Sequence, residues 1–302
     1  MEPLPAPRFH LGCPAWSVPS WKGNFLPAKT KPADFLEHYA RVFSSVEGNS
    51  TFYALPSLET ARRWASQVPS HFQFCFKVPR SISHGEGLLA NSSGHLDFLE
   101  FLEVFAEAGV LGPSFLQLHQ SFGPSRLKEL DQFCQAWPQI FPFAIEVRHP
   151  AFFQSGKEEN ELQNLLSSQD MDRVIFDSGA LYQSPPDDPI EAVSQTRKPN
   201  LPVRWEVAGQ RPFLRLVGRN QSQKADPWLQ AAAKVAAEWI ADGRHPYLFM
   251  HSPDDTFAPT LAERFHRFLE AEVPGLPPLD LSPASEEDQL SLFDRPITGD
   301  TG

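Results

Sequence analysis

The chain has 302 residues, of which 41% are hydrophobic and 12% aromatic, and its formal net charge is −11. This length suits one large α/β barrel or two smaller domains, and the negative charge argues against a surface built for nonspecific nucleic-acid binding. No apolar run is long enough to span a membrane, and the first residues lack the pattern of a signal peptide. The three cysteines lack CxxC spacing, so we expect reduced thiols in a cytoplasmic protein without membrane contact.

Strands and helices are predicted to alternate along most of the chain. The alternation of apolar residues predicts strands at 9–13, 45–53, 72–78, 115–119, 143–148, 173–177, 213–217 and 247–250. Amphipathic patterns and capping residues predict helices at 33–43, 57–64, 95–108, 125–137, 161–168, 227–242 and 259–272. Eight strands that alternate with helices along most of the chain point to a single-domain (β/α)8 TIM barrel over residues 1–274, and a doubly wound open sheet is the alternative.

Two segments break this rhythm. Residues 184–212 show little periodicity and are predicted to form a long loop of the kind that often serves as a lid. Residues 275–302 are rich in Pro, Ser, Glu and Asp and are predicted to be a disordered tail.

The predicted strand at 45–53 carries an unusual polar face. If the strand is regular, Glu47, Asn49 and Thr51 point the same way. Buried polar groups need partners, so this face either lines a polar cavity or lies in solvent. We expect the substitution Glu47→Gln to abolish any activity while leaving folding nearly intact.

Polar side chains also occupy the ends of the other strands from the third to the eighth. In a TIM barrel, the C-terminal ends of the strands and the following loops form the functional mouth. The candidate residues there are Glu47, Asn49, Thr51, Lys77, Arg80, Gln117, His119, Glu146, Arg148, His149, Asp177, Arg215, Arg219, His251 and Asp254. Any one of them could simply cap a loop. Together they favour a functional pocket, because buried ion-pair networks stabilise folding poorly relative to apolar packing.

The chemistry of this set suggests an anionic ligand, since its cations outnumber its carboxylates and arginine forks suit phosphate oxygens. The predicted substrate-binding residues are Asn49, Thr51, Lys77, Arg80, Gln117, Arg148, His149, Arg215 and Arg219. The predicted catalytic carboxylates are Glu47, Glu146 and Asp177. A divalent metal for phosphodiester hydrolysis could be held by Glu47, Glu146, His119 and His251. Alternatively, Glu47 and Glu146 merely pair with the arginines.

Several motifs together resemble a known family. They include Val46-Glu47-Gly48-Asn49-Ser50-Thr51-Phe52-Tyr53, Lys77-x-Pro79-Arg80, Glu146-x-Arg148-His149-Pro150 and Arg215-Leu216-x-Gly218-Arg219. In this order they resemble the YecE-like family, also called domain of unknown function 72, over about residues 8–272. The resemblance implies a TIM barrel with the matched polar residues at its mouth, and it implies no particular activity.

The tail contains a second resemblance. Gln289, Leu290, Leu292 and Phe293 lie in a five-residue stretch that is similar to the bacterial sliding-clamp-binding pentapeptide. An extended peptide of this kind could place two apolar side chains in a pocket of the DNA polymerase sliding clamp. Docking of the tail on its own barrel is the alternative.

Three functions are compatible with these features. The first is an enzyme, plausibly metal-dependent, that hydrolyses a nucleic-acid phosphodiester in DNA repair or replication. The second is a noncatalytic module that senses a small anion and is tethered to the clamp. The third is a sugar-phosphate isomerase or lyase. The sequence leaves open whether the protein is a catalyst.

Overall fold

The structure is a computed structural model that describes residues 8–85, 87–207 and 209–281. Its eight strands are β1 (His10–Gly12), β2 (Ser45–Gly48), β3 (Gln73–Phe76), β4 (Ser114–Gln117), β5 (Phe143–Glu146), β6 (Asp172–Asp177), β7 (Phe213–Val217) and β8 (Tyr247–His251). All the strand pairs are parallel, which requires a crossover connection after each strand.

The strands follow one another around a closed barrel. Six of them form a sheet in the order β1-β8-β7-β6-β5-β4, and β2 pairs with β3. Backbone hydrogen bonds also connect the two sheets: the amide of Glu47 donates to the carbonyl of Cys13 (3.0 Å) on one side, and on the other side the bonds include that from the amide of Val78 to the carbonyl of Phe115 (2.9 Å). The predicted (β/α)8 barrel is therefore confirmed.

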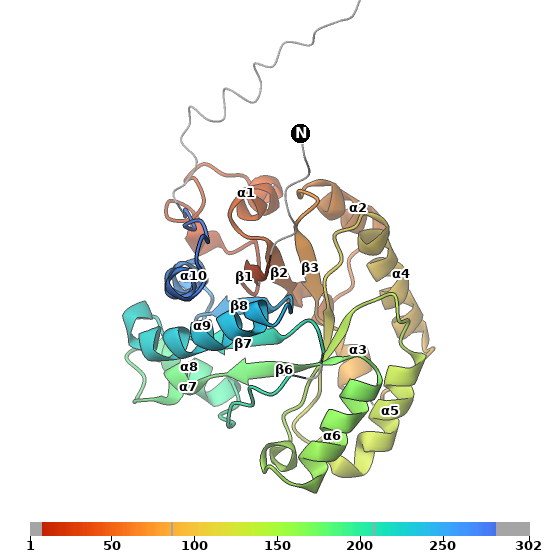
Figure 1. Ribbon diagram of the computed structural model, residues 1–302. Helices are drawn as coiled ribbons and strands as arrows, with labels where there is room; N and C mark the ends of the chain where they lie inside the picture. The colour runs from red at the N-terminus through yellow and green to blue at the C-terminus, as the bar shows by residue number, and fades with distance from the viewer. Residues whose placement is uncertain (1–7, 86, 208, 282–302) are drawn as a thin grey trace, which may run out of the picture.

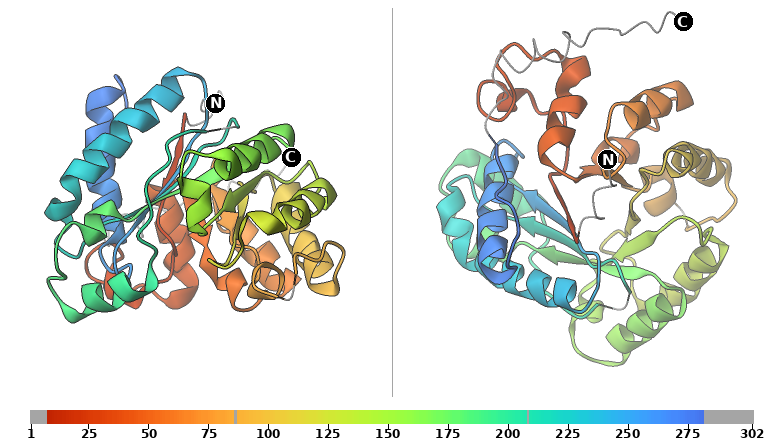
Figure 2. Two further views of the ribbon diagram at one scale, coloured as in Figure 1. Left: turned by 90° about the horizontal axis from the view of Figure 1, so that it is seen from below. Right: turned by 45° about the horizontal axis from the view of Figure 1, so that its top comes forward.

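Helices surround the strands on the outside, as Figure 1 and the two views of Figure 2 show. They are α1 (Phe35–Val42), α2 (Leu58–Ser66), α3 (Arg80–Ser83), α4 (Ser93–Glu107), α5 (Leu127–Ala136), α6 (Lys157–Ser168), α7 (Gly179–Tyr182), α8 (Pro189–Arg197), α9 (Asp226–Ala241) and α10 (Ala258–Glu272). In the part of the chain described, none of them is both long and apolar enough to cross a membrane.

The apolar core has two layers, which the alternation of side chains along each strand separates. One layer lies between strands and helices and includes Leu116 and Ile145. The other fills the barrel interior and consists of Cys75, Phe115, Ala144, Val174, Phe213, Tyr247 and Phe249. This interior layer forms an apolar floor beneath the polar side chains at the C-terminal strand ends. The three cysteines of the chain are buried free thiols.

The predicted strand at 45–53 is too long. β2 ends at Gly48, and residues Asn49–Phe52 form a 3-10 helix, so Thr51 does not share a strand face with Glu47. The Thr51 hydroxyl instead donates to the backbone carbonyls of Gly48 (3.1 Å) and Lys77 (2.6 Å). Thr51 therefore fixes the backbone below the mouth, where two neighbouring strands end.

The prediction of a structureless segment over 184–212 is also wrong, because α8 lies within it. Asp188 accepts a hydrogen bond from the amide of Glu191 (2.8 Å), and Pro189 occupies the first turn, so the capping signals were present in the sequence. The helix escaped detection because its buried positions are Glu191 and Ser194 rather than apolar residues.

The beginning of the predicted tail packs on the barrel. Leu276, Leu279 and Leu281 contact the core, and His266 Nε2 lies 2.8 Å from the carbonyl oxygen of Pro277. The clamp-like motif at 289–293 lies outside the described residues.

Candidate functional site

A buried ion-pair network occupies the top of the barrel. Arg215 of β7 donates through Nε to Glu47 Oε2 and through Nη2 to Glu47 Oε1, both at 2.7 Å, and through Nη1 to Glu146. Its guanidinium carbon lies 5.0 Å from the centre of the Phe115 ring, on the apolar floor. Glu47 is fully buried and Glu146 is 1% exposed, so one arginine joins two carboxylates from β2 and β5 in a region shielded from water.

Further partners extend this network toward solvent. Arg148 donates through Nε to Glu146 Oε1 (2.6 Å) and through Nη2 to Gln117 Oε1 (2.8 Å). Lys77 Nζ donates to the same Gln117 oxygen, also at 2.8 Å. A neutral amide from β4 therefore connects two cations that follow β3 and β5.

Glu47 has two more partners. Asn49 Nδ2 donates to Glu47 Oε1 at 2.7 Å, and His251 Nε2 lies 3.2 Å from Glu47 Oε2. The Asn49 amide also donates to the carbonyl of Pro14 (3.0 Å), which anchors it after β1. We refer to Glu47, Asn49, Lys77, Gln117, Glu146, Arg148, Arg215 and His251 as the Arg215 cluster.

The cluster holds its carboxylates ionised. Burial alone would raise the pKa of Glu47, but Arg215 and His251 outweigh it and hold that pKa well below its usual range. Burial opposes ionisation of Glu146 too, yet Arg148, Arg215 and Lys77 lower its pKa to about 2. Burial would lower the pKa of Arg215, and its two glutamates instead raise it. Both glutamates are therefore weak bases at neutral pH.

Lys77, unlike the glutamates and Arg215, is shifted toward its neutral form. Burial and the neighbouring Arg215 lower the pKa of its amine to about 7, and the carboxylates of Glu146 and Glu47 reduce that shift without cancelling it. The side chain is 9% exposed, and Nζ lies 4.1 Å from the centre of the Phe52 ring. A large fraction of this amine is consequently neutral at physiological pH.

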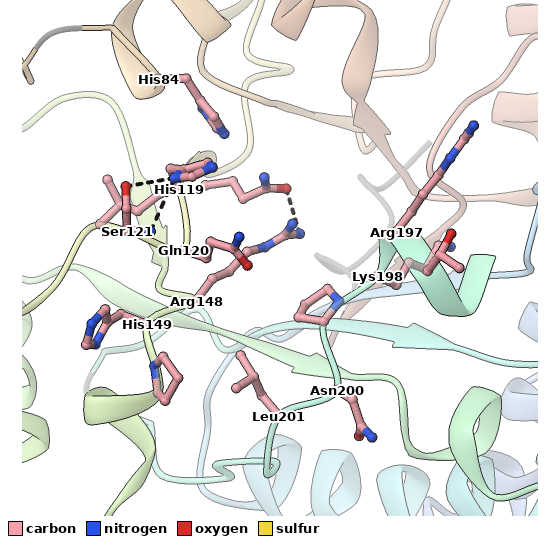
Figure 3. Close-up of a pocket in the computed structure, with 15 residues that line it drawn as sticks. His84, His119, Gln120, Ser121, Arg148, His149, Arg197, Lys198, Asn200 and Leu201 are labelled. Atoms are coloured by element: carbon pink, nitrogen blue, oxygen red, sulfur yellow. Dashed lines mark hydrogen bonds between the residues drawn. The ribbon is translucent and has the colours of Figure 1, made fainter. Parts of the chain in front are cut away.

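A cavity of about 690 Å³ opens above the cluster, and we call it the mouth cavity. Figure 3 shows two facing walls: residues that follow β4 and β5, including His119 and Arg148, and the chain from Arg197 to Leu201 at the end of α8. Its charged or titratable lining residues are Arg148, Arg197, Lys198, His84, His119 and His149. None of the described residues that line it is Asp or Glu.

Three histidines lie along this cavity. His84 and His119 lie edge to face with ring centres 5.5 Å apart, and burial together with nearby cations lowers the pKa of His84 to about 4. His119 Nδ1 lies 2.8 Å from the Ser121 hydroxyl at the exposed rim. His149 Nδ1 accepts from the amide of Ala151 (3.2 Å), which orders the turn after β5.

Several predicted site residues do not join the cluster, among them Arg80, Asp177 and Arg219. Arg80 is exposed at the start of α3. Asp177 accepts from the amide of Gly179 (2.8 Å) at the start of α7, and burial raises its pKa. Arg219 is fully buried and donates through Nε to Glu191 of α8 (3.1 Å). These contacts give Asp177 and Arg219 structural partners.

The residues predicted to hold a metal do not gather as a ligand set. The oxygens of Glu47 and Glu146 accept from arginines, and His119 lies at the rim. In the ranges that the structure describes, no group of three or more His, Cys, Asp or Glu side chains is arranged to hold a metal ion.

Several residues at the site were not predicted, and four of them contribute charged or aromatic groups. Arg197 and Lys198 line the cavity, and Lys198 Nζ donates to the carbonyl of Ser252 (3.3 Å). They lie where the sequence predicted a loop, although a basic pair before Pro199 is typical of a helix C-terminus. His84 follows the predicted strand 72–78 by several residues, and Phe52 lies within the predicted strand 45–53, where only polar residues were candidates.

The fold and the cluster together define an α/β-barrel protein with a cation-lined mouth. A family model described as "Protein of unknown function DUF72" matches residues 10–287. The chain is 35% identical to the UPF0759 protein YecE of Escherichia coli strain K12 over 284 residues, which cover 94% of this chain and 99% of that protein. The chain therefore belongs to the DUF72 family, as the resemblance implied.

Solved structures of DUF72 family proteins share the fold. One from Thermotoga maritima aligns with a TM-score of 0.67 and 21% identity, covering 87% of this chain and 99% of that chain. One from Enterococcus faecalis aligns with a TM-score of 0.66 and 18% identity, covering 92% of this chain and 99% of that chain.

Proposed function

We propose that the protein binds a small phosphate-bearing ligand in the mouth cavity. The observation that supports this most directly is the sign of the lining. Arg148, Arg197 and Lys198 line the cavity without any Asp or Glu among the described lining residues, although the whole chain carries a net charge of −11. Cations gathered in a concave site of an acidic protein are expected to attract an anion.

The volume of the mouth cavity suits a small ligand. Its volume of about 690 Å³ falls in the usual range for small-molecule sites, about 300–1,000 Å³. The Arg148 fork is already oriented by Glu146 and Gln117, so little side-chain entropy would be lost on binding. A single nucleotide or a sugar phosphate matches this volume better than a duplex does.

The contacts of Glu47 and Glu146 favour a role in positioning the arginines over a role as general bases. Both oxygens of Glu146 accept from Arg148 and Arg215, and its low pKa makes it a poor proton acceptor. We therefore propose that Glu47 and Glu146 hold the arginines in place. Phosphodiester hydrolysis, a link to DNA repair or replication, and attachment to a sliding clamp stay predictions.

Isothermal titration calorimetry tests the proposal with ribose 5-phosphate and with ribose as the uncharged match. We expect the phosphate to be required and binding to weaken as salt rises. The substitution Arg148→Gln should weaken binding about 10- to 100-fold, since a charge-assisted hydrogen bond contributes roughly 1.5–3 kcal/mol.

Arg62→Gln is the matched control, because it removes the same charge from an exposed position of α2 outside the cavity. It should leave the affinity unchanged. Equal binding of ribose and its phosphate, or equal effects of the two substitutions, would contradict the proposal.

A further inference from the structure

We propose that Lys77 is a nucleophilic amine that forms a Schiff base with an aldehyde or ketone carrying a phosphate group. This inference rests on the proposed function, because the phosphate would bind in the mouth cavity and place the carbonyl group beside the amine. It adds a reactive class of ligand and a covalent step to that function.

The geometry separates Lys77 from the ordinary role of a buried lysine, which is to pair with a carboxylate. In the described residues no Asp or Glu oxygen lies within ion-pair distance of Lys77 Nζ. The two carboxylates of the cluster are engaged by Arg215 and Arg148. Within the described residues, the amine donates its hydrogen bond to the oxygen of the neutral Gln117 amide.

The surroundings of the amine favour its neutral form. The charged and titratable groups that act on it are Arg215 of β7, Glu146 and Arg148 at the end of β5, Glu47 of β2, and His84 after α3. The two arginines and burial together outweigh the two glutamates, which lowers the pKa of the amine to about 7. The unprotonated, nucleophilic form of Lys77 is therefore much more populated at neutral pH than that of an ordinary lysine.

The position of the Lys77 amine beside Arg148 also supports the inference. Lys77 Nζ and Arg148 Nη2 each lie 2.8 Å from Gln117 Oε1, so the amine and the guanidinium are neighbours around one acceptor. Arg148 and Gln117 line the mouth cavity. Lys77 itself, 9% exposed, is not among the lining residues and lies behind the Gln117 amide. The inference therefore requires the carbonyl end of a short phosphate-bearing molecule to reach past Gln117 to the amine.

The step balances without a redox partner. The nitrogen lone pair of Lys77 attacks the carbonyl carbon, and the carbonyl oxygen gains a proton to give a carbinolamine. Loss of that oxygen with the two amine protons, as one water, leaves a carbon–nitrogen double bond. The resulting imine withdraws electrons from the adjacent carbon, which is the basis of lyase and isomerase chemistry on sugar phosphates.

Reductive trapping tests the inference on the full chain. The protein is incubated at pH 7.5 with D-glyceraldehyde 3-phosphate and sodium cyanoborohydride, and the modified lysine is identified by peptide mass spectrometry. We expect at least tenfold more label on Lys77 than on Lys234, an exposed lysine of α9 that does not line the cavity and serves as an internal control. Lys77→Met should abolish this label, and Lys234→Met, at an exposed position of α9, should not.

The outcomes distinguish the inference from the proposed function. If ribose 5-phosphate binds but Lys77 is not labelled preferentially, the inference is wrong and the binding proposal stands. If Lys77 is labelled equally by glyceraldehyde and its phosphate, the amine is reactive and the phosphate requirement of both proposals is wrong. Peptide mapping of the unsubstituted protein gives the answer even if Lys77→Met fails to fold.

Discussion

Glu47→Gln is the substitution that examines the Arg215 cluster most directly. Glu47 is fully buried and accepts two hydrogen bonds of 2.7 Å from Arg215. Removing one partner of a buried ion pair costs about 3–5 kcal/mol. We expect about 3 kcal/mol here, because Arg215 keeps Glu146 and a glutamine oxygen can still accept one bond. This differs from the sequence-based expectation that Gln at this position would leave folding nearly intact.

Urea denaturation at pH 7, followed by circular dichroism, measures the free energy of unfolding. A loss of about 3 kcal/mol corresponds to a lowering of Tm by roughly 6–12 °C for a domain of this order of size. Glu37→Gln is the matched control, since Glu37 makes an exposed pair with Arg41 at 2.7 Å and such pairs contribute about 0–1 kcal/mol. Equal effects of the two substitutions would refute the assignment of Glu47 as a structural centre of the cluster.

The contribution of Glu47 to the free energy of unfolding should change with pH in a defined direction. The pKa of Glu47 is lower in the folded chain than in the unfolded chain, so its ionised form stabilises folding fully above the unfolded-state pKa, about 4.3. That contribution is lost as pH falls toward the folded-state pKa. The stability difference between the unsubstituted protein and Glu47→Gln should therefore be constant from pH 6 to 8 and shrink below about pH 4. A difference that grows on acidification would contradict the sign.

Three further predictions concern other parts of the chain. Gly12→Ala should lower the free energy of unfolding by at least about 3 kcal/mol, measured by urea denaturation, because a Cβ there would lie 2.0 Å from the Ser45 carbonyl oxygen. Arg219→Met should cost about 3–5 kcal/mol by leaving Glu191 buried and unpaired, and a second substitution, Glu191→Met, should recover much of that loss in the same assay. Deletion of 289–293 should abolish any binding to purified sliding clamp in calorimetry and leave the urea midpoint unchanged; a full-length chain that does not bind the clamp would refute the motif.

Much of the fold was predictable from alternating hydrophobicity. β7 occupies 213–217 as predicted, because apolar residues on both sides of Arg215 suit a strand buried on both faces. Strand ends were less accurate where polar residues continue past the sheet, as at Asn49, which begins a 3-10 helix. α8 was missed because its buried face carries Glu191, and charge pairing at a distance is invisible to periodicity.

The site was predictable only in part. Strand-end reasoning named Glu47, Glu146, Arg148 and Arg215, which the structure brings into contact. It also named Arg219, which turns away to α8 because the chain leaves the strand after position 217. The sequence could not indicate which cation pairs with which carboxylate. That pairing decides which charges are left to line the mouth cavity.

The apolar floor of the barrel has a consequence for the order of events in the mouth cavity. The interior is filled by aromatic side chains such as Phe115, Phe213 and Phe249, whose ring centres lie 5.0–5.2 Å apart between neighbours. A bound molecule therefore has the mouth as both its entrance and its exit. A ligand held near the floor, as we propose, would therefore be blocked from leaving by anything bound above it, so a second molecule in the mouth should slow its dissociation.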